Sequence, residues 1–221
     1  MDQFDFTLLL NDLWHLLKHL LYWGTGPFII WAIWWRKKNF FGWIGLKKIS
    51  GGWQRSAVWI LIFTAIGFLS QIFIVPHVLP SGIAAADRMA GMGIKALYRA
   101  ILFGISTGFV EELFWRGFLG KRLSIKLGFT LGNHIQGFLF GLMHGVGFFW
   151  MLMVLRAHGA LEITLFSIAT KCILITVIGW FGGWILGYMT EKVAGGSIIP
   201  AFLAHALGNF LLAMAKAYEV L

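Results

Sequence analysis

Charged residues are scarce in this chain, since Asp, Glu, Lys and Arg make up 12% of its 221 residues, against roughly 25% in an average soluble domain. Hydrophobic residues make up 59%, and the mean hydropathy is +0.79. This balance excludes a water-soluble globular fold. Because a transmembrane helix takes about 20 apolar residues, the length predicts an all-α, polytopic membrane helix bundle with about six transmembrane helices.

Cysteine is nearly absent as well, and this excludes two classes of site. The single cysteine, Cys172, lies within an apolar run, so neither a disulfide framework nor a cysteine-based metal site is available. A basic segment is also lacking before the first Leu run, where Asp2 and Asp5 lie instead. We therefore expect no cleavable signal peptide.

Acidic residues are half as frequent as basic ones, which leaves a formal net charge of +9. In a soluble protein such a charge would suggest a nucleic-acid partner. Here Lys and Arg lie mostly in short stretches between apolar runs, where the positive-inside rule places them. We therefore expect membrane lipids and no nucleic acid as partners.

Six apolar stretches are predicted to span the membrane. They cover residues 20–35, 57–79, 96–119, 129–152, 161–190 and 197–215. This alternation places the basic stretches 36–55 and 121–126, together with Lys192, on one side. The positive-inside rule makes that side cytoplasmic, and a polar loop at 80–88 is expected on the other. The prediction is a multi-pass protein of the cytoplasmic membrane.

Residues 6–23 have a polar face and an apolar face. The polar residues of this stretch are Asn11, Asp12, His15, Lys18 and His19. Their spacing gathers them on one side of a helix, which is typical of an amphipathic helix lying in the membrane interface. The alternative is a first spanning helix that turns this polar face inward.

Three charged residues lie close together in the second half of the apolar stretch 96–119: Glu111, Glu112 and Arg116. Charges at bilayer depth cost about 2.5 to 3.5 kcal/mol each on insertion scales, so they usually mark a function. Glu112 and Arg116 are four residues apart and can pair along one face, either as a structural ion pair or within an active site. Glu111 points about 100° away from Glu112 on a helix and is free to meet another partner.

Further polar residues lie in two later apolar stretches. His144 follows Phe140 by four residues, and Asn209 follows His205 by four residues, which places imidazole and amide on one helix face. These groups suit hydrolysis, because a carboxylate or an imidazole can take a proton from water, while a second imidazole and an amide can bind an oxyanion. The sequence therefore predicts one shared polar site built by three helices.

The three motifs resemble those of a known family. Glu-Glu-x-x-x-Arg, Phe-x-x-x-His and His-x-x-x-Asn, in this order, are similar to the motifs of the CAAX-protease and bacteriocin-processing (CPBP) intramembrane endopeptidases. In this chain they consist of Glu111, Glu112, Arg116, Phe140, His144, His205 and Asn209. The similarity extends over residues 104–212. It implies a catalytic core at 96–221, preceded at 1–95 by the N-terminal helix and two spans without a motif, all within one membrane domain.

The resemblance also implies roles for these residues. Glu111 and His144 would activate the attacking water, His205 and Asn209 would stabilise the oxyanion, and Glu112 and Arg116 would support them. The site would open toward the cytoplasm and cut a membrane-bound or prenylated peptide or protein. No cofactor is favoured, and a glutamyl mechanism is preferred.

A divalent metal such as zinc, held by Glu111, His144 and His205, stays open as an alternative. One Glu and two His form a legitimate catalytic zinc set, but no HExxH helix is present.

Two other functions would use the same residues differently. A proton- or cation-coupled transporter would use the buried Glu and His side chains as an ion pathway, although the chain lacks paired broken helices and inverted repeats. A non-catalytic immunity or scaffold protein of the same fold would keep the motifs without the activity.

Overall fold

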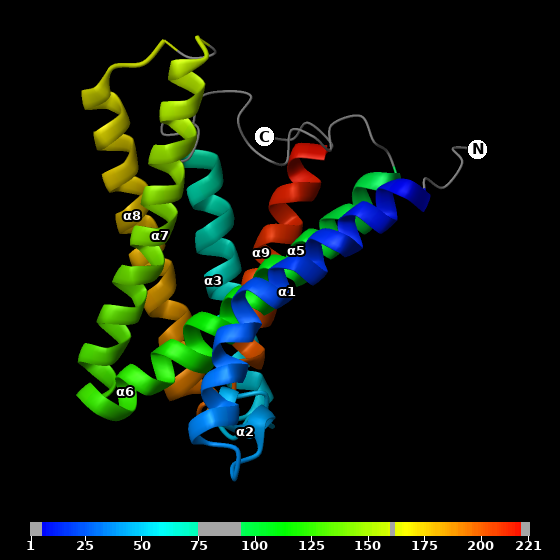
Figure 1. Ribbon diagram of the computed structural model, residues 1–221, viewed down its shortest axis with the longest axis vertical. Helices are drawn as coiled ribbons and strands as arrows, with labels where there is room; N and C mark the ends of the chain where they lie inside the picture. The colour runs from blue at the N-terminus through cyan, green and yellow to red at the C-terminus, as the bar shows by residue number, and fades with distance from the viewer. Residues whose placement is uncertain (1–5, 75–93, 160–161, 218–221) are drawn as a thin grey trace.

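The computed structural model describes residues 6–74, 94–159 and 162–217 (Figure 1). Its elements are α1 (Phe6–Trp34), α2 (Phe40–Ile44), α3 (Trp53–Phe73), α5 (Ile94–Glu112), η2 (Leu113–Gly120), α6 (Lys121–Leu127), α7 (Phe129–Ala157), α8 (Leu165–Tyr188), η3 (Met189–Val193) and α9 (Ile199–Ala217). No β-strand occurs in the described ranges, and the prediction of an all-α membrane bundle is confirmed. The expected polar loop at 80–88 and the end of the second span lie outside the described residues.

Among the described residues, three helical stretches have the length and apolar character needed to cross a membrane: Trp53–Ser70, Phe129–Ala157 and Leu165–Val193. Large apolar side chains cover their outward faces, as Trp150 (71% exposed) and Phe166 (83% exposed) illustrate. Such exposure is unfavourable in water and favourable in lipid. The molecule is an integral membrane protein.

The N-terminal segment differs from the prediction. The expected interfacial helix and the expected first span form one continuous helix, α1, with Pro27 inside it. The Thr25 hydroxyl donates to the Leu21 carbonyl across the predicted break. Asp12 pairs with Arg99 of α5 at 2.9 Å, and the Trp23 ring lies 4.9 Å from that of Phe114. The expected division into an interfacial helix and a first span is not observed: residues 6–34 form one helix, which contacts α5 and η2.

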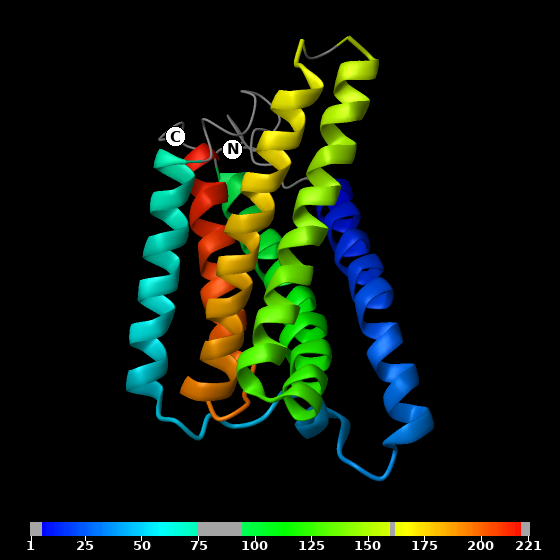
Figure 2. The same cartoon turned by 90° about the vertical axis from the view of Figure 1, so that its left-hand side faces the viewer.

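Helices α7 and α8 pack side by side through glycine (Figures 1 and 2). A Cβ atom added at Gly141 of α7 would collide with the Thr176 carbonyl, and one added at Gly179 of α8 would lie 2.8 Å from the Gly141 Cα. Small residues allow this close approach of two backbones in a membrane. The α7–α8 pair holds one wall of the site.

Gly141→Leu should destabilise the protein by about 1 to 3 kcal/mol, because the new side chain has no room between α7 and α8. Denaturant unfolding in detergent micelles would measure this. Gly147→Ala is the matched control on the same helix, since nothing lies within 4 Å of a Cβ atom there. Equal stability of the two variants would contradict the tight glycine interface.

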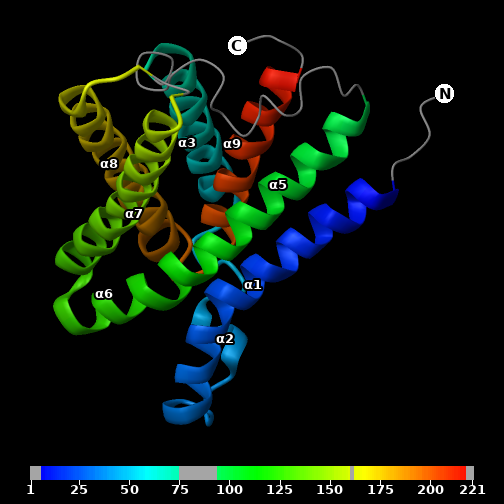
Figure 3. The same ribbon diagram turned by 45° about the horizontal axis from the view of Figure 1, so that its top comes forward.

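Helices α5 and α9 form a second close pair, which Figure 3 shows crossing near α1. A Cβ atom at Gly104 would lie 2.6 Å from the Ala206 carbonyl oxygen, and one at Gly108 would lie 2.8 Å from the Ala206 nitrogen. This approach places Glu112, at the end of α5, beside His205 of α9. Helix α3 packs on the other side of α9.

The predicted span at 96–119 is helical but changes its winding halfway. Helix α5 ends at Glu112 and passes directly into η2, a π-helical segment that ends at Gly120. Helix α8 likewise passes into a shorter π-helical segment, η3. Such segments are frequent at functional sites, and both lie near the charged residues described below.

The basic stretches gather at one end of the bundle, with α2 and α6 (Figure 1). Lys121 Nζ donates to the Gly196 carbonyl at 2.6 Å, and the Arg122 guanidinium lies 3.6 Å from the Trp43 ring centre. The prediction that the basic stretches lie on one side of the bundle is confirmed. We call this the basic end.

Candidate active site

Glu112 is the centre of the charged cluster. Its side chain is completely buried, and its Oε1 accepts hydrogen bonds from Arg116 Nη1 at 2.7 Å and from His205 Nδ1 at 2.9 Å. The predicted pairing of Glu112 with Arg116 is confirmed. The bond to His205 was not predicted, because the two residues are far apart in sequence and meet only through the packing of α5 on α9.

Arg116 connects this cluster to the α7–α8 pair. The side chain is 1% exposed. Its Nη2 donates to the Gly183 carbonyl of α8 at 3.3 Å, and its guanidinium lies 4.4 Å from the centre of the Phe140 ring. Gln136 Nε2 donates to the same carbonyl at 2.8 Å. Sequence reasoning missed Gln136, although a buried amide in an apolar helix is a usable signal.

His144 lies on α7 and is half-buried. Its Nδ1 is 2.9 Å from the Phe140 carbonyl oxygen. Because a carbonyl only accepts, this nitrogen carries the proton, and Nε2 of the neutral ring keeps a lone pair. The Phe140 ring centre lies 4.5 Å from that of His144 and 6.3 Å from that of His205. Phe140 therefore separates the two imidazoles and packs on both.

Asn209 is oriented by a residue that the sequence motifs do not include. Its Nδ2 donates to Thr107 Oγ1 at 2.7 Å, and this hydroxyl donates to the Phe103 carbonyl at 2.6 Å. The amide nitrogen has a second hydrogen that this bond does not use.

His144, His205 and Asn209 line one cavity of about 430 Å³. Helices α3, α7, α8 and α9 form it. Its other walls are mostly apolar: Phe63, Ile66, Gly67, Ser70, Ile74, Phe140, Ile175, Ile178, Gly179, Phe181, Gly182, Ile185, Gly208 and Leu212. An apolar cavity with a few convergent polar groups is the usual form of a ligand site. The predicted gathering of the two histidines and the asparagine is observed.

Glu111 lies beside this cavity, not among the residues that line it. It is half-buried, and its Oε2 is buried without a hydrogen-bond partner among the described residues. Its charge acts on both Arg116 and His205. Glu111 is therefore close to the site and free of a structural bond at this oxygen.

The zinc alternative names Glu111, His144 and His205 as ligands. In the described part of the chain, no group of three or more His, Cys, Asp or Glu side chains is arranged to hold a metal ion. Nδ1 of His205 is bonded to Glu112, and Nδ1 of His144 to a carbonyl.

A family model described as type II CAAX prenyl endopeptidase Rce1-like matches residues 93–211. The match runs from the start of α5 into α9, and it covers every motif residue named above. No curated protein and no solved structure matches the chain.

Proposed function

Because the chain belongs to the Rce1-like type II CAAX prenyl endopeptidase family, we propose that it is an intramembrane endopeptidase acting on a membrane-associated, prenylated peptide or protein. The observation that carries this proposal is that His144, His205 and Asn209 line one cavity, while Glu112 of a third helix holds His205 from behind. The bond to be cut follows the lipidated Cys of a C-terminal CAAX sequence.

His144 and Glu111 activate the water in this proposal. The lone pair on His144 Nε2 or the free Glu111 oxygen accepts a proton while the water oxygen attacks the peptide carbonyl carbon. The same proton then passes to the leaving nitrogen as the carbon–nitrogen bond breaks. Phe140 holds the His144 ring in place through its carbonyl and its ring.

His205 and Asn209 stabilise the oxyanion formed by this attack. His205 donates one ring proton to Glu112, so a second donor at Nε2 requires the imidazolium form. Glu112 and Glu111 together supply the two negative charges that face this imidazolium and Arg116. Asn209 supplies the amide hydrogen that Thr107 does not use. Fixed donors in a site shielded from water are among the strongest sources of transition-state stabilisation.

The apolar walls of the cavity suit a lipidated or hydrophobic substrate. The position of the cavity favours entry of the substrate from the cytoplasm, because the active site lies near the basic end. His205 is six residues into α9, about 9 Å along a helix axis. Glu112 is nine residues before Lys121, where α6 begins at the same end.

Purified protein in liposomes should cleave a fluorogenic peptide that ends in a prenylated CAAX sequence. A strong chelator should leave the rate unchanged, because the mechanism uses only protein groups. Mass spectrometry of the products would locate the cut. Loss of activity on chelation that returns with added zinc would overturn the metal-free mechanism. Ion movement without any cleavage would favour the transporter.

A further inference from the structure

A small void lies behind Arg116, on the side of the basic end. Its volume is about 10 Å³, which is close to what one water molecule requires. The residues around it are almost all polar or glycine: Arg116, Gly120, Ser124, Asn133, Gln136, Gly187, Thr190 and Glu191. Apolar voids stay dry, but a polar void of this size suits a bound water.

Four buried polar atoms belong to residues that line this void and lack a hydrogen-bond partner among the described residues. They are Arg116 Nε, Gln136 Oε1, Thr190 Oγ1 and Glu191 Oε1. Leaving a buried polar atom unpaired costs about 1 to 3 kcal/mol. One donor, two acceptors and a hydroxyl that can do both match the two to four partners that a buried water needs.

The Thr190 hydroxyl, like that of Thr64, lacks the backbone bond that other helical threonines of this protein make. Thr107, Thr170 and Thr176 each donate to the carbonyl four residues earlier in their helix. Thr190 lies in the π-helical η3, and its hydroxyl makes no such bond. Arg116 and Gly120 lie in the other π-helical segment, η2. Both departures from α-helical winding therefore face the same void.

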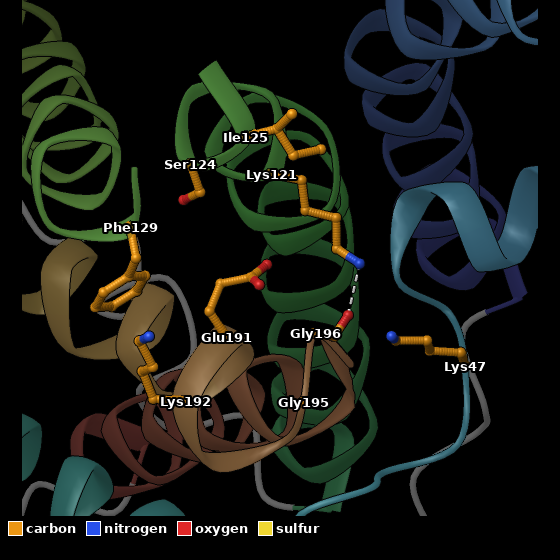
Figure 4. A pocket seen from close by; sticks show the side chains of 9 residues that line it. All are labelled: Lys47, Lys121, Ser124, Ile125, Phe129, Glu191, Lys192, Gly195 and Gly196. Carbon is orange, nitrogen blue, oxygen red and sulfur yellow. Dashed lines mark hydrogen bonds between the residues drawn. The ribbon is translucent and has the colours of Figure 1, made fainter. Parts of the chain in front are cut away.

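The void adjoins a larger pocket at the basic end, of about 350 Å³. Both cavities are lined by Ser124 and Glu191. Figure 4 shows the Glu191 carboxylate pointing into the pocket between Ser124 and Lys121, whose Nζ is held by the Gly196 carbonyl. Burial is the main cause that lowers the pKa of Lys121 to about 8. A polar route thus runs from this pocket past Glu191 and Thr190 to Arg116, the partner of Glu112.

We propose that the void is an ordered-water site, and that with the basic-end pocket it forms the route by which hydrolytic water enters the active site. The inference rests on the proposed peptidase function, because each peptide bond cut consumes one water. The walls of the active-site cavity are mostly apolar and offer water few partners. The void offers water hydrogen-bond partners next to Arg116.

The Thr190→Val substitution tests the water site, because a dry void and a hydrated void predict opposite changes in the unfolding temperature. If the void is dry, removing an unpaired hydroxyl at equal volume keeps or raises the unfolding temperature. If a water is bound, the variant loses one of its partners and the unfolding temperature falls. Thr190→Ser keeps the hydroxyl and is the matched control. If Thr190→Val does not fold, Thr190→Ala removes the same hydroxyl without placing a methyl group in its position and is compared with Thr190→Ser.

Two further measurements complete the test. A crystal structure from a lipidic mesophase should show a water bonded to Thr190 Oγ1 and Gln136 Oε1. In the prenyl-peptide assay, Thr190→Val should lower kcat by about 5-fold with KM unchanged, the equivalent of one lost hydrogen bond, whereas Thr190→Ser should stay near the wild-type rate.

The outcomes separate the two proposals. The water site is overturned if the crystal structure shows no water in the void and Thr190→Val does not lower the unfolding temperature. This outcome does not depend on whether the protein cleaves peptides. An ordered water with unchanged kcat in Thr190→Val overturns the supply route. A wild-type protein that cleaves nothing overturns the peptidase function and the supply route that rests on it, while the density and the unfolding temperature still decide the water site.

Discussion

Glu112→Ala is expected to destabilise the protein by about 3 to 5 kcal/mol, because it leaves the guanidinium of Arg116 buried without its counter-charge. Arg116 is 1% exposed, so bulk solvent does not reach its charge. The variant should also lose cleavage activity, since His205 loses the partner of its Nδ1. Denaturant unfolding in micelles measures the first effect, and the prenyl-peptide assay measures the second.

A double variant, Glu112→Leu with Arg116→Met, separates a structural ion pair from a functional one. Replacing a buried ion pair by apolar side chains of similar volume is often neutral or stabilising. We expect the double variant to regain most of the stability and to stay inactive. Wild-type cleavage by the double variant would mean that the pair serves only to hold the helices together. Glu162→Ala is the control, because it removes a negative charge at an exposed position. It shows whether losing a carboxylate is enough to change stability or activity.

His144→Ala is expected to lower kcat by about 10²- to 10⁴-fold, the usual contribution of a positioned proton acceptor. KM should change little, because apolar walls supply most of the substrate contact. His144 is half-buried at the cavity, so the folded state should survive the change. Single-turnover cleavage of the prenylated peptide measures the chemical step.

His158→Ala is a closely matched control for this prediction. His158 follows α7 directly, and its Nδ1 lies 2.8 Å from the carbonyl oxygen of Val154, four residues earlier, as His144 does with Phe140. It is exposed and far from the cavity. Equal losses in the two variants would show that the helix, and not the chemistry at His144, had been disturbed.

The sequence predicted what is local or tied to a motif, and missed what depends on packing. The pairing of Glu112 with Arg116 follows from helical spacing alone. The bond from Glu112 to His205 does not, because glycines of α5 bring the helices together only in three dimensions. Thr107 was missed for the same reason, since a Thr in an apolar helix carries no signal until its partner, Asn209, is known.

The course of the backbone was predicted less well than its helical character. The polar face of residues 6–23 suggested an interfacial helix separate from the span at 20–35, but residues 6–34 form one helix that contains Pro27 and is held by α5. The π-helical segments η2 and η3 were not predicted, because their sequences are compatible with ordinary helix. The roles assigned to Glu111, His144, His205 and Asn209 remain predictions that the variants above would test.

The two glycine-packed helix pairs divide the proposed chemistry between them. The proton acceptor His144 belongs to the α7–α8 pair, whereas His205 and Asn209 belong to the α5–α9 pair. Arg116 bridges the pairs through Glu112 on one side and the Gly183 carbonyl on the other. The distance between the attacking water and the oxyanion donors therefore depends on how the two pairs lie against each other, which Arg116 and the Phe140 ring, packed on both histidines, hold together.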